Sequence, residues 1–410
     1  MDGDILFLAH RLPFPPDRGD KIRSHNVLKT LAQIAPVHVG CLGESEADIA
    51  HLHELEALAA SWCMPRRSKP LPLAGLEALG RGEPVSISAF RSAELAQWVK
   101  RTIRERDIAA IYVFSGQMGQ FVPMDWAGRL IVDLVDVDSA KFEAFGADAS
   151  GPRAWVDRRE GRLLGAVEAG LVQRADITLL VSEAEADLLR SRVGDNGRIR
   201  ALRNGIDCAA FDPERVAIQP DIAARSGPHV VFTGQMDYAP NVDAVERFAL
   251  RILPQLQVDF PYLEFHIVGR APTAAVQELG QLVGVTVWSE VPDVKPFLAA
   301  ADLVCAPLTI ARGVQNKVLE AMAMERCVLL SPEAATGIDA RHGEHFAVAG
   351  SDEAMVAQAR DLLQRQQDRE VIGKAARQFV LDHMSWPAML AALPQIMSGQ
   401  PTGGTCRDAA

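Results

Sequence analysis

Residues 309–325, TIARGVQNKVLEAMAME, place two cations, a glycine and a carboxylate around the expected start of a helix. Arg312 and Gly313 precede this helix near residue 314, and Lys317 lies in its first turn. Cations at a helix N-terminus oppose the helix dipole unless an anion lies between them and the backbone amides. Glu320 follows one turn later and could accept two hydrogen bonds from a ribose diol. The apolar run VLEAMAM favours a partly buried binding helix; the alternative is a Lys317–Glu320 surface ion pair, worth about 0.2–0.5 kcal/mol.

A second candidate is the loop at 10–26, HRLPFPPDRGDKIRSHN, which follows the first predicted strand. Its prolines keep the chain out of a helix until about residue 18. Gly19 lets the backbone approach a ligand closely, and the helix after it presents N-terminal amides, where anions bind. Lys21 and Arg23 add positive charge. The alternative is a solvated proline-rich loop; the residues expected to contact a ligand are Arg18, Gly19 and Asp20.

Three aspartates cluster at the end of a further apolar run, LIVDLVDVDSAKF. Acids in such a place are costly unless they bind something or cap a helix. Asp136 could orient or deprotonate an acceptor hydroxyl within hydrogen-bond reach. Asp138 or Ser139 could instead cap the next helix. The S-x-x-E spacing at 182–185 is explained by a capping box alone.

Single glycines follow two strand-like runs in the second half of the chain. Gly234 ends VFTG, and Gly269 with Arg270 ends the run FHIVGR. Each glycine permits close approach of a phosphate to the backbone. One such glycine is a weak signal, whereas several at the ends of strands in one domain are a moderate one.

Behind these loops, short apolar runs alternate with helical patterns in both halves of the chain, which predicts βαβ units and parallel sheets. The first half has strand-like runs at 4–10, 37–43, 108–115, 130–136 and 177–183, and helix-like stretches at 23–34, 93–106 and 154–174. The second half has strand-like runs at 229–234, 263–269, 285–291, 303–308 and 327–332, and helix-like stretches at 241–257, 273–282, 294–300 and 314–324.

The predicted fold is therefore α/β, with two doubly wound, Rossmann-like domains facing a cleft. The first domain spans residues 1–210 and the second 211–380, joined through a proline-rich linker near 205–226. A helix at about 380–397 is expected to pack back on the first domain, and residues 398–410 to be disordered. In open parallel sheets ligands bind at the carboxyl ends of the strands, where all the candidate loops lie.

Composition limits the function further. The 410 residues carry a net charge of −11, which argues against a nucleic-acid binder. The six cysteines form no C-x-x-C pair and fit a reducing compartment. The N-terminus lacks a secretory signal, and no apolar run reaches the length of a membrane span, so a cytoplasmic protein is expected. Residues 153–174 combine arginines with apolar residues and could lie on an anionic membrane surface, but a helix packed on the sheet with a basic outer face is favoured.

These stretches resemble the GT-B glycosyltransferases of the large retaining family 4, over about residues 4–395. The resemblance is carried, in the family's order, by ADITLLVSEAEADLL, RNGIDCAAF, VFTGQM, FHIVG, VPDVKPFLAAADLVCAPL and NKVLEAMA. More narrowly, three stretches are similar to the sugar transferases associated with PEP-CTERM/exosortase exopolysaccharide loci: LFLAHRLPFPPDRGDKIRSHN, IVDLVDVDSAKF and ARGVQNKVLEAMAM.

The resemblance implies transfer of a sugar, with retention of configuration, from a UDP- or GDP-sugar held mainly by the C-terminal domain. The acceptor, a glycan or a polyprenyl-diphosphate-linked glycan, would be held by the N-terminal domain, with peripheral contact to the inner membrane. No cofactor or metal is implied, and the D-x-D spelling at 136–138 lies on the acceptor side. The implied donor contacts are Gly19, Gly234, Arg270, Gly313, Lys317 and Glu320, with Glu320 on the ribose. The candidate catalytic residues are Asp136, Arg312 and Lys317, and the candidate acceptor contacts are Arg18, Asp20 and Asp138.

Three departures from the family pattern bear on this expectation. Arg312 stands where the family often has a first glutamate, which implies a changed sugar contact. Glu325 and Cys327 replace the usual G-x-P after the helix, which puts its C-cap geometry in question. The Arg/Lys pair usual after the FTG strand is absent, so neutralisation of the diphosphate would depend on Arg312, Lys317 and Arg270.

Three other functions stay open from the sequence. A nucleotide-sugar epimerase would share the two-domain architecture and need no acceptor. A NAD-dependent oxidoreductase should show G-x-G-x-x-G after the first strand, and HRLPFPPDRG does not. A non-catalytic scaffold of a polysaccharide assembly complex is supported by Arg312 but opposed by Gly19, Lys317 and Glu320.

Overall fold

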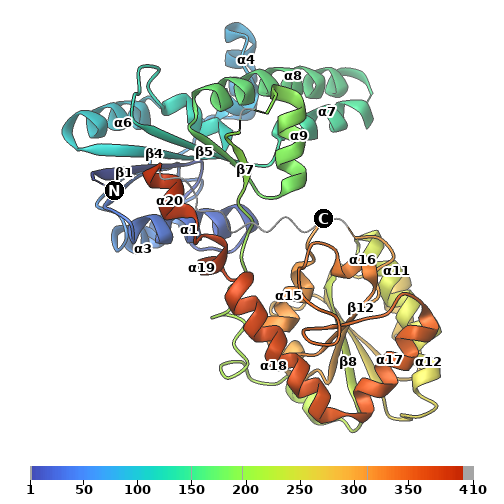
Figure 1. The fold of residues 1–410 in the computed structure, drawn as a ribbon. Coiled ribbons are helices and arrows are strands. Elements are labelled where there is room, and N and C mark those ends of the chain that lie inside the picture. Colours follow the sequence, from blue (N-terminus) through green and yellow to red (C-terminus); the bar gives the residue numbers. More distant parts are fainter. Residues whose placement is uncertain (1, 149, 196, 312, 400–410) are drawn as a thin grey trace. The chain divides into compact units, whose positions relative to one another are not determined.

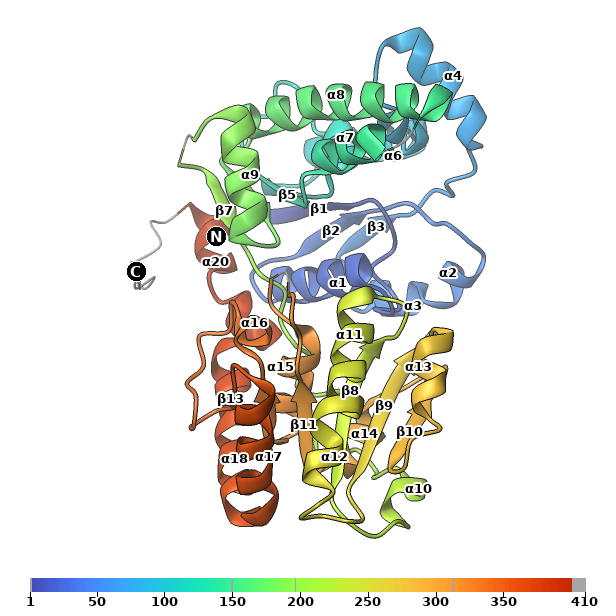
Figure 2. The ribbon, with the colours of Figure 1, turned by 90° about the vertical axis from the view of Figure 1, so that its right-hand side faces the viewer.

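A computed structural model of the chain describes residues 2–148, 150–195, 197–311 and 313–399. The chain divides into two compact units (Figures 1 and 2). Unit 1 runs to Asn204 and resumes at Met389, and unit 2 comprises Gly205–Ala388. The division falls between Asn204 and Gly205, six residues before the boundary expected from the sequence.

Unit 1 is built on a seven-stranded sheet in the order β3-β2-β1-β4-β5-β6-β7, and every neighbouring pair of strands is parallel. Its strands are β1 (Asp4–Ala9), β2 (Val37–Gly40), β3 (Ser61–Cys63), β4 (Ile108–Phe114), β5 (Arg129–Val135), β6 (Ile177–Leu180) and β7 (Ile199–Ala201). Its helices are α1 (Gly19–Ala32), α2 (Ala47–Ala50), α3 (Leu52–Glu56), α4 (Leu71–Arg81), α5 (Val85–Ala89), α6 (Ala93–Glu105), η1 (Gly116–Phe121), α7 (Asp138–Asp148), α8 (Gly151–Arg174), α9 (Glu183–Val193) and α20 (Leu393–Ser398).

Unit 2 repeats this plan with a six-stranded parallel sheet in the order β10-β9-β8-β11-β12-β13. Its strands are β8 (His229–Gln235), β9 (Glu264–Arg270), β10 (Val285–Trp288), β11 (Leu303–Ala306), β12 (Val328–Leu330) and β13 (Ala347–Val348). Its helical segments are α10 (Pro220–Ala223), α11 (Ala239–Arg247), η2 (Phe248–Ile252), α12 (Leu253–Leu256), α13 (Ala274–Leu279), α14 (Lys295–Ala300), α15 (Asn316–Ala323), α16 (Pro332–Ala335), α17 (Asp352–Gln364) and α18 (Gln366–His383); α19 (Trp386–Met389) ends at the boundary with unit 1.

The central strands are continuous apolar runs because helices cover both faces of each parallel sheet. Ile5, Phe7, Val230 and Phe232 are fully buried, as expected for such strands. In both sheets the strand order reverses beside the first strand, between β1 and β4 and between β8 and β11. Ligands of doubly wound sheets bind at such switch points, so the loops after β8 and β11 are the first place to look for a ligand site in unit 2.

The sequence does not predict every element. The three strands β3, β7 and β13 have at most three residues each, which is too short for a periodic pattern. The helix expected over 241–257 is three segments, with a π-helical turn η2 between α11 and α12. Pro254 supplies a local reason, because it has no backbone N–H to donate to the preceding turn.

The C-terminal helix expected at about 380–397 is also interrupted. α18 ends at His383, and α19 and α20 are separate short helices. α20 packs on α1 and β5 of unit 1, where Arg129 Nε donates a 2.8 Å hydrogen bond to the carbonyl of Ile396. The tail expected to be disordered lies, from residue 400 on, outside the described residues. Among the described helices, none has both the length and the apolar character that a membrane crossing requires.

Candidate functional site

A pocket of about 580 Å³ lies at the carboxyl edge of the sheet in unit 2. The loops after β8, β9 and β10 line it, together with the start of α15. Its size is within the range of small-molecule sites. The lining residues are Thr233, Gly234, Gln235, Asn241, Gly269, Arg270, Val291, Pro292, Asp293, Val294, Val314, Asn316, Lys317 and Glu320.

Two glycines on neighbouring strands make this pocket possible. A Cβ on Gly269 would stand 1.7 Å from the carbonyl oxygen of Gly234, so no other residue fits there. A Cβ on Gly234 would stand 2.8 Å from the amide nitrogen of Asn241 and 3.0 Å from Lys317 Nζ. The sequence interpretation was that both glycines admit a phosphate. In the structure Gly269 is first required by the close approach of the Gly234 backbone, and Gly234 by the side chains of Asn241 and Lys317.

Lys317 is held in place on two sides. Its Nζ donates a short hydrogen bond to Asn241 Oδ1 and lies 4.3 Å from the centroid of the Phe232 ring. Burial lowers the pKa of Lys317 to about 8, although Glu320 opposes this effect. No carboxylate lies within 4.0 Å of Nζ among the described residues. The ammonium group is therefore a positioned cation at the pocket, and its charge is unbalanced by an ion pair.

Glu320 lines the same pocket one turn further along α15. Burial raises the pKa of its carboxyl group, while Lys317 and Lys295 act in the opposite direction. Its carboxylate takes part in no hydrogen bond or ion pair with the rest of the described chain. The surface ion pair with Lys317, which the sequence left open, is therefore not formed. Glu320 is free to accept hydrogen bonds from a ligand.

The remaining predicted donor residues lie at the edge of this pocket. Arg270 lines it and is exposed. Gly313 has a positive φ of 67°, which bends the loop before α15. Arg312, predicted to be catalytic, lies outside the described residues. Sequence reasoning missed Asn241, whose signal was its place at the start of the helix that follows VFTGQM, and it missed the loop 291–294, which carries no glycine signal.

The α15 helix keeps its expected end despite the unusual sequence there. Glu325 adopts φ = 57°, in the left-handed region that a glycine usually occupies. The amide of Arg326 donates to the carbonyl of Ala321, and the amide of Glu325 donates to that of Met322. These two bonds are a Schellman motif. The departure from G-x-P therefore changes the residue and preserves the turn.

In unit 1, Arg18, Gly19 and Asp20 lie together at the start of α1. Arg11 donates a 2.6 Å hydrogen bond to Asp20, and His10 Nε2 lies 3.1 Å from the same carboxylate oxygen. These contacts, with His10 first, hold the pKa of Asp20 well below its usual range. Arg18 is half exposed and bonds to Glu44 at 2.9 Å. A Cβ on Gly19 would meet nothing within 4 Å, so open space lies beside it.

Sequence reasoning missed most of this charged cluster. Glu44, in the loop after β2, accepts hydrogen bonds from Arg11 and Arg18 in the loop after β1 and from Arg67 in the loop after β3, and thus joins these three loops. His10 stacks on Phe114 at 5.8 Å. No local pattern could have identified Glu44, because its partners come together only in the folded sheet.

Two cations assigned to this loop from the sequence are used elsewhere, and that interpretation is wrong. Arg23 is fully buried, binds Asp133 through two nitrogens at 3.0 and 3.1 Å, and donates to the carbonyl of Leu202 at 2.7 Å. Lys21 is buried, donates to the carbonyl of Phe14 at 3.1 Å, and lies 3.6 Å from Asp48. Neither side chain is available to an added anion.

The three aspartates at the end of β5 have different surroundings. Asp133 is buried and accepts from Arg23, as above, and from the Tyr112 hydroxyl at 2.8 Å. Asp136 is partly exposed, and Lys141 Nζ donates to it at 2.7 Å. Val135, between them, has φ = 70°, an uncommon conformation for a β-branched residue. Such strain is often found beside functional groups, and it directs the chain toward Asp136.

The N-terminus of α7 has its own partners. Glu168 accepts hydrogen bonds from the amide and hydroxyl of Ser139, and Glu185 accepts from the amide of Val137 at 2.7 Å. Asp138 is the first residue of α7, and among the described residues only Gln117 and Lys141 reach its carboxylate, at 3.4 and 3.5 Å. Capping by Asp138 or Ser139 is therefore wrong, because acids from α8 and α9 supply this role. Likewise only half of the capping box at 182–185 forms, since Glu185 reaches Val137.

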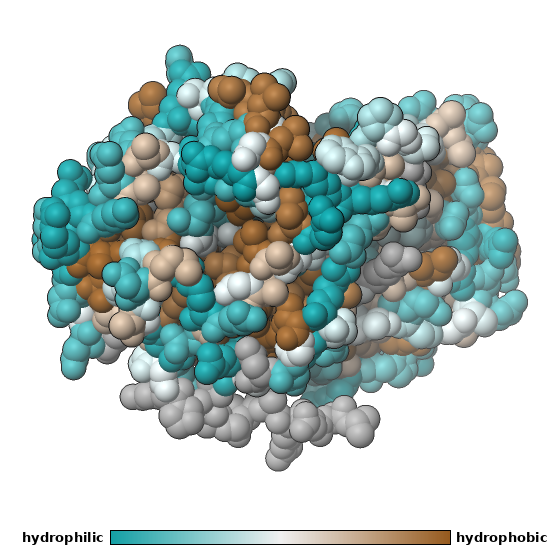
Figure 3. All heavy atoms as spheres, turned by 90° about the horizontal axis from the view of Figure 1, so that it is seen from above, coloured by the Kyte–Doolittle hydropathy of each residue, from teal (hydrophilic) through white to brown (hydrophobic). Residues whose placement is uncertain are grey.

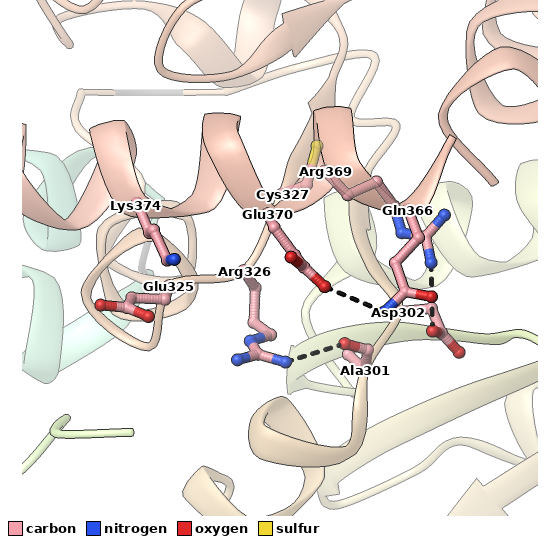
Figure 4. A pocket seen from close by; sticks show the side chains of 9 residues that line it. All are labelled: Ala301, Asp302, Glu325, Arg326, Cys327, Gln366, Arg369, Glu370 and Lys374. Atoms are coloured by element: carbon pink, nitrogen blue, oxygen red, sulfur yellow. Dashed lines mark hydrogen bonds and ion pairs between the residues drawn. The ribbon is translucent and has the colours of Figure 1, made fainter. Parts of the chain in front are cut away.

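A smaller pocket of about 160 Å³ lies at the opposite, amino edge of the unit 2 sheet (Figure 4). Arg369 bonds to Asp302 at 3.4 Å, and Arg326 points its guanidinium at the carbonyl of Ala301 at 3.3 Å. Glu370 accepts from Gln366 at 2.9 Å. Its charged groups largely bind one another or the backbone, so it is a weaker candidate than the pocket at the carboxyl edge.

One group of described residues has the spacing of metal ligands. His229, Glu264 and His266 offer ligand atoms within 4.8 Å of one another, also at the amino edge. However, the Trp288 indole donates to His266 Nδ1 at 3.2 Å, which assigns the proton of the neutral ring to Nε2. Burial lowers the pKa of His266 to about 3, so the ring stays neutral. Nε2 then donates to His229 Nδ1 at 3.1 Å, and these hydrogen bonds occupy the lone pairs that a metal would need.

Residues 227–365 match the protein family described as "Glycosyl transferases group 1". Solved structures resemble nearly the whole chain. Anabaena Alr3699/HepE in complex with UDP has a TM-score of 0.61 and 15% identity, over 97% of this chain and 100% of that one. The chain has the GT-B fold.

Two further GT-B structures give similar values. Sucrose-phosphate synthase from Thermosynechococcus elongatus has a TM-score of 0.58 and 16% identity, over 97% of this chain and 98% of that one. A glycosyltransferase from Rickettsia africae has a TM-score of 0.58 and 13% identity, covering 98% and 99%. A search of curated proteins found no match. The group 1 match contains every residue that lines the larger pocket and supports a glycosyltransferase.

Proposed function

We propose that this protein transfers a sugar from a nucleotide-diphospho-sugar to a glycan or lipid-linked acceptor, and that the pocket of unit 2 binds the donor. The observation that carries the proposal is the pairing, at a switch point, of a positioned cation with an unpartnered carboxylate, Lys317 and Glu320. UDP is the favoured nucleotide, because Anabaena Alr3699/HepE is described in complex with UDP, with UDP-glucose, and with UDP and glucose. GDP is the second candidate.

The roles of the donor residues follow from their chemistry. The Glu320 carboxylate accepts hydrogen bonds from the ribose hydroxyls. The Lys317 ammonium faces the diphosphate, with Arg270 at the rim. Breaking the bond between the sugar C1 and the diphosphate oxygen leaves the electron pair on the nucleoside diphosphate. A preorganised cation stabilises that charge most where water is scarce. Gly313 and Arg312 belong to the loop that would lie beside the same groups.

The acceptor is proposed to bind to unit 1. Asp136 orients the acceptor hydroxyl or accepts its proton as the hydroxyl oxygen forms the new bond to the sugar C1, and the strained Val135 before it supports a functional role for this corner. Its ion pair with Lys141 has to open for proton transfer. Arg18, Asp20 and Asp138 are the proposed acceptor contacts, with Gly19 beside the donor. Retention of configuration, independence of metal and a role in exopolysaccharide synthesis are part of the proposal and rest on the sequence resemblance.

Nucleotide binding tests the donor site directly. The purified protein is screened by thermal shift with UDP, GDP, their common sugars and NAD. A ligand that binds only the native state raises the free energy of unfolding, by about 2.7 kcal/mol at a concentration 100 times its dissociation constant. The melting temperature rises accordingly. We expect a shift with UDP or UDP-sugars that Glu320→Ala removes.

The matched control is Glu370→Ala. Glu370 is an exposed acid of the same unit at the opposite edge of the sheet. This variant should respond to UDP as the unchanged protein does. No shift with any nucleotide in a folded sample would refute the transferase proposal and favour the scaffold. A shift with NAD alone would favour the oxidoreductase.

A second assay separates a transferase from an epimerase of the same fold. The donor that binds is incubated with the protein and with lipid-linked oligosaccharides, and free and transferred sugars are measured. An epimerase would release an epimerised sugar without an acceptor. Transfer that requires an acceptor and is reduced more than tenfold by Asp136→Asn, with unchanged UDP binding, is the expected result.

A further inference from the structure

The helix α4 in unit 1 exposes its large apolar side chains and buries small ones. Its two buried side chains are Ala74 and Ala78. Its four leucines all point outward and are more than half exposed: Leu71, Leu73, Leu76 and Leu79. A helix on a protein surface normally buries its large apolar side chains and exposes small or polar ones. The leucines of α4 have no partner within the described chain that covers them.

The neighbouring helix α8 extends this surface with aromatic and cationic side chains. Arg159 donates a 3.0 Å hydrogen bond to the carbonyl of Ala78 and thereby joins α8 to α4. Trp155 is 59% exposed and lines a shallow hollow together with Arg158, Arg159 and Arg162. Figures 1 and 2 show α4 beside α8, and Figure 3 views this side, where hydrophobic groups lie among hydrophilic ones.

The charges of α8 are divided between its two faces. Its three acids, Asp157, Glu160 and Glu168, are all buried. Glu160 accepts hydrogen bonds from the amides of Val85 and Ser86, which fixes the start of α5. By contrast, Arg158 and Arg159 donate to backbone carbonyls, and these two and Arg162 have no carboxylate within 4.0 Å in the described chain. The outer face is thus cationic, although the chain as a whole carries a net charge of −11.

We propose that this surface, the α4/α8 face, docks on an anionic lipid bilayer. The face is defined by the four leucines of α4 with Trp155, Arg158, Arg159 and Arg162 of α8. Exposed leucines and a tryptophan insert into the interfacial region, and arginines beside them bind anionic headgroups. A protein partner would need no such separation of arginines from acids, whereas charge complementarity to a negative bilayer accounts for it. An apolar patch of this kind on a single chain marks an interaction site.

The helix 153–174 was expected from the sequence to pack on the sheet with a basic outer face. The inference adds α4, which no sequence pattern singled out. In the proposed docking face α4 supplies the leucines, and α8 supplies the tryptophan and the arginines. It does not depend on the donor site, because every residue of the α4/α8 face lies in unit 1 and none lines the donor pocket. Docking and nucleotide binding can therefore succeed or fail separately.

The test is co-sedimentation of the full chain with vesicles of phosphatidylcholine containing 30% phosphatidylglycerol, and with phosphatidylcholine alone. We expect the protein to bind the anionic vesicles and to bind the neutral vesicles much more weakly. The double variant Arg158→Gln/Arg162→Gln should bind the anionic vesicles about 25-fold more weakly, at about fivefold for each arginine. Leu73→Ser/Leu76→Ser should bind at least about tenfold more weakly on apolar area alone.

The control is Leu250→Ser/Arg251→Gln in unit 2. Both side chains are exposed, at 56% for Leu250 and 72% for Arg251, so the control removes the same residue types from a different surface. It should bind vesicles as the unchanged protein does. A blue shift of Trp155 fluorescence on binding, absent in Trp155→Phe, reports insertion of this face. The melting temperature of each variant and its shift by UDP check that the fold is intact.

Several outcomes would overturn the proposal. The unchanged protein could fail to bind anionic vesicles, or the two variants of the α4/α8 face could bind as it does. If the control variant Leu250→Ser/Arg251→Gln binds vesicles as weakly as the variants of the α4/α8 face, vesicle binding would depend on the general charge and apolar content of the protein and not on this face. Self-association that Leu73→Ser/Leu76→Ser abolishes, without vesicle binding, would show that a second copy of the chain covers the leucines.

Discussion

Lys317→Met should stabilise the ligand-free protein while it removes nucleotide binding. Burial lowers the pKa of Lys317 to about 8, against the ordinary 10.5. This difference corresponds to about 3 kcal/mol, at about 1.4 kcal/mol for each pKa unit. The fold therefore carries this cost whenever Lys317 is charged and no anion is bound. Methionine has a similar length and no charge, so it removes the cost.

Loss of the hydrogen bond to Asn241 offsets part of the gain, by about 1 kcal/mol. The net stabilisation of unit 2 by Lys317→Met is then about 2 kcal/mol at pH 7. For a unit of this size, 1 kcal/mol changes the melting temperature by about 2–4 °C. The expected increase is therefore about 4–8 °C, measured by calorimetry without ligand on the unfolding transition of unit 2.

The pH dependence gives the sign of the effect. Because the pKa of Lys317 is lower in the folded state, the cost is fully present below pH 8. It decreases as the pH rises from about 8 to 10.5, where the folded state releases its proton before the unfolded state does. The advantage of Lys317→Met over the unchanged protein should therefore be constant from pH 6 to 7.5 and become small by pH 10.

Two observations would refute this reasoning. Lys317→Met could be less stable than the unchanged protein at pH 7, which would mean that the amine is held by net favourable contacts. Alternatively, the difference in melting temperature could stay the same from pH 6 to 10, which would mean that the charge has no part in it. Lys100→Met is the control, since Lys100 is exposed in unit 1, and it should change the unit 2 transition at no pH.

Three further predictions concern the stability of the fold, and each is measured by chemical unfolding. Glu325→Gly should stabilise unit 2 by about 0.5–1 kcal/mol, because glycine adopts the positive φ of this helix end without strain. Gly269→Ala should destabilise by more than about 3 kcal/mol or prevent folding, since its Cβ would overlap the carbonyl oxygen of Gly234. Asp133→Ala should cost about 3–5 kcal/mol, because it leaves the charge of Arg23 buried without its partner.

Each of these has a matched comparison. Gly80→Ala, in α4 where a Cβ meets nothing within 4 Å, should be tolerated, in contrast to Gly269→Ala. Replacing both Asp133 and Arg23 by apolar residues should cost much less than Asp133→Ala alone. A neutral or destabilising effect of Glu325→Gly would show that its long contact to Arg377, at 3.9 Å, outweighs the backbone strain.

The architecture of this protein and several residues that line the pocket of unit 2 can be predicted from the amino-acid sequence. The alternation of apolar runs with helical patterns was enough to predict two α/β domains with parallel sheets, because both sheets are built from strands buried on both faces. The order of loops along the chain was enough to bring Gly234, Arg270, Lys317 and Glu320 to one edge of one sheet. The strands β3, β7 and β13 escaped prediction because they have at most three residues each, whereas the helices α4, α17 and α18 were not predicted although they have 11, 13 and 18 residues.

The role of each charged side chain depends on its neighbours in the folded chain and could not be predicted from the sequence. Three charged residues occupy positions in the sequence that are typical of ligand-binding loops, yet each is buried against a partner: Lys21, Arg23 and Asp133. Glu168 carried no signal in the sequence and Glu185 was assigned to a capping box of its own helix, yet both bind backbone amides at the start of α7. A charge binds a ligand or another residue according to what lies within about 4 Å, and those neighbours come from distant parts of the chain.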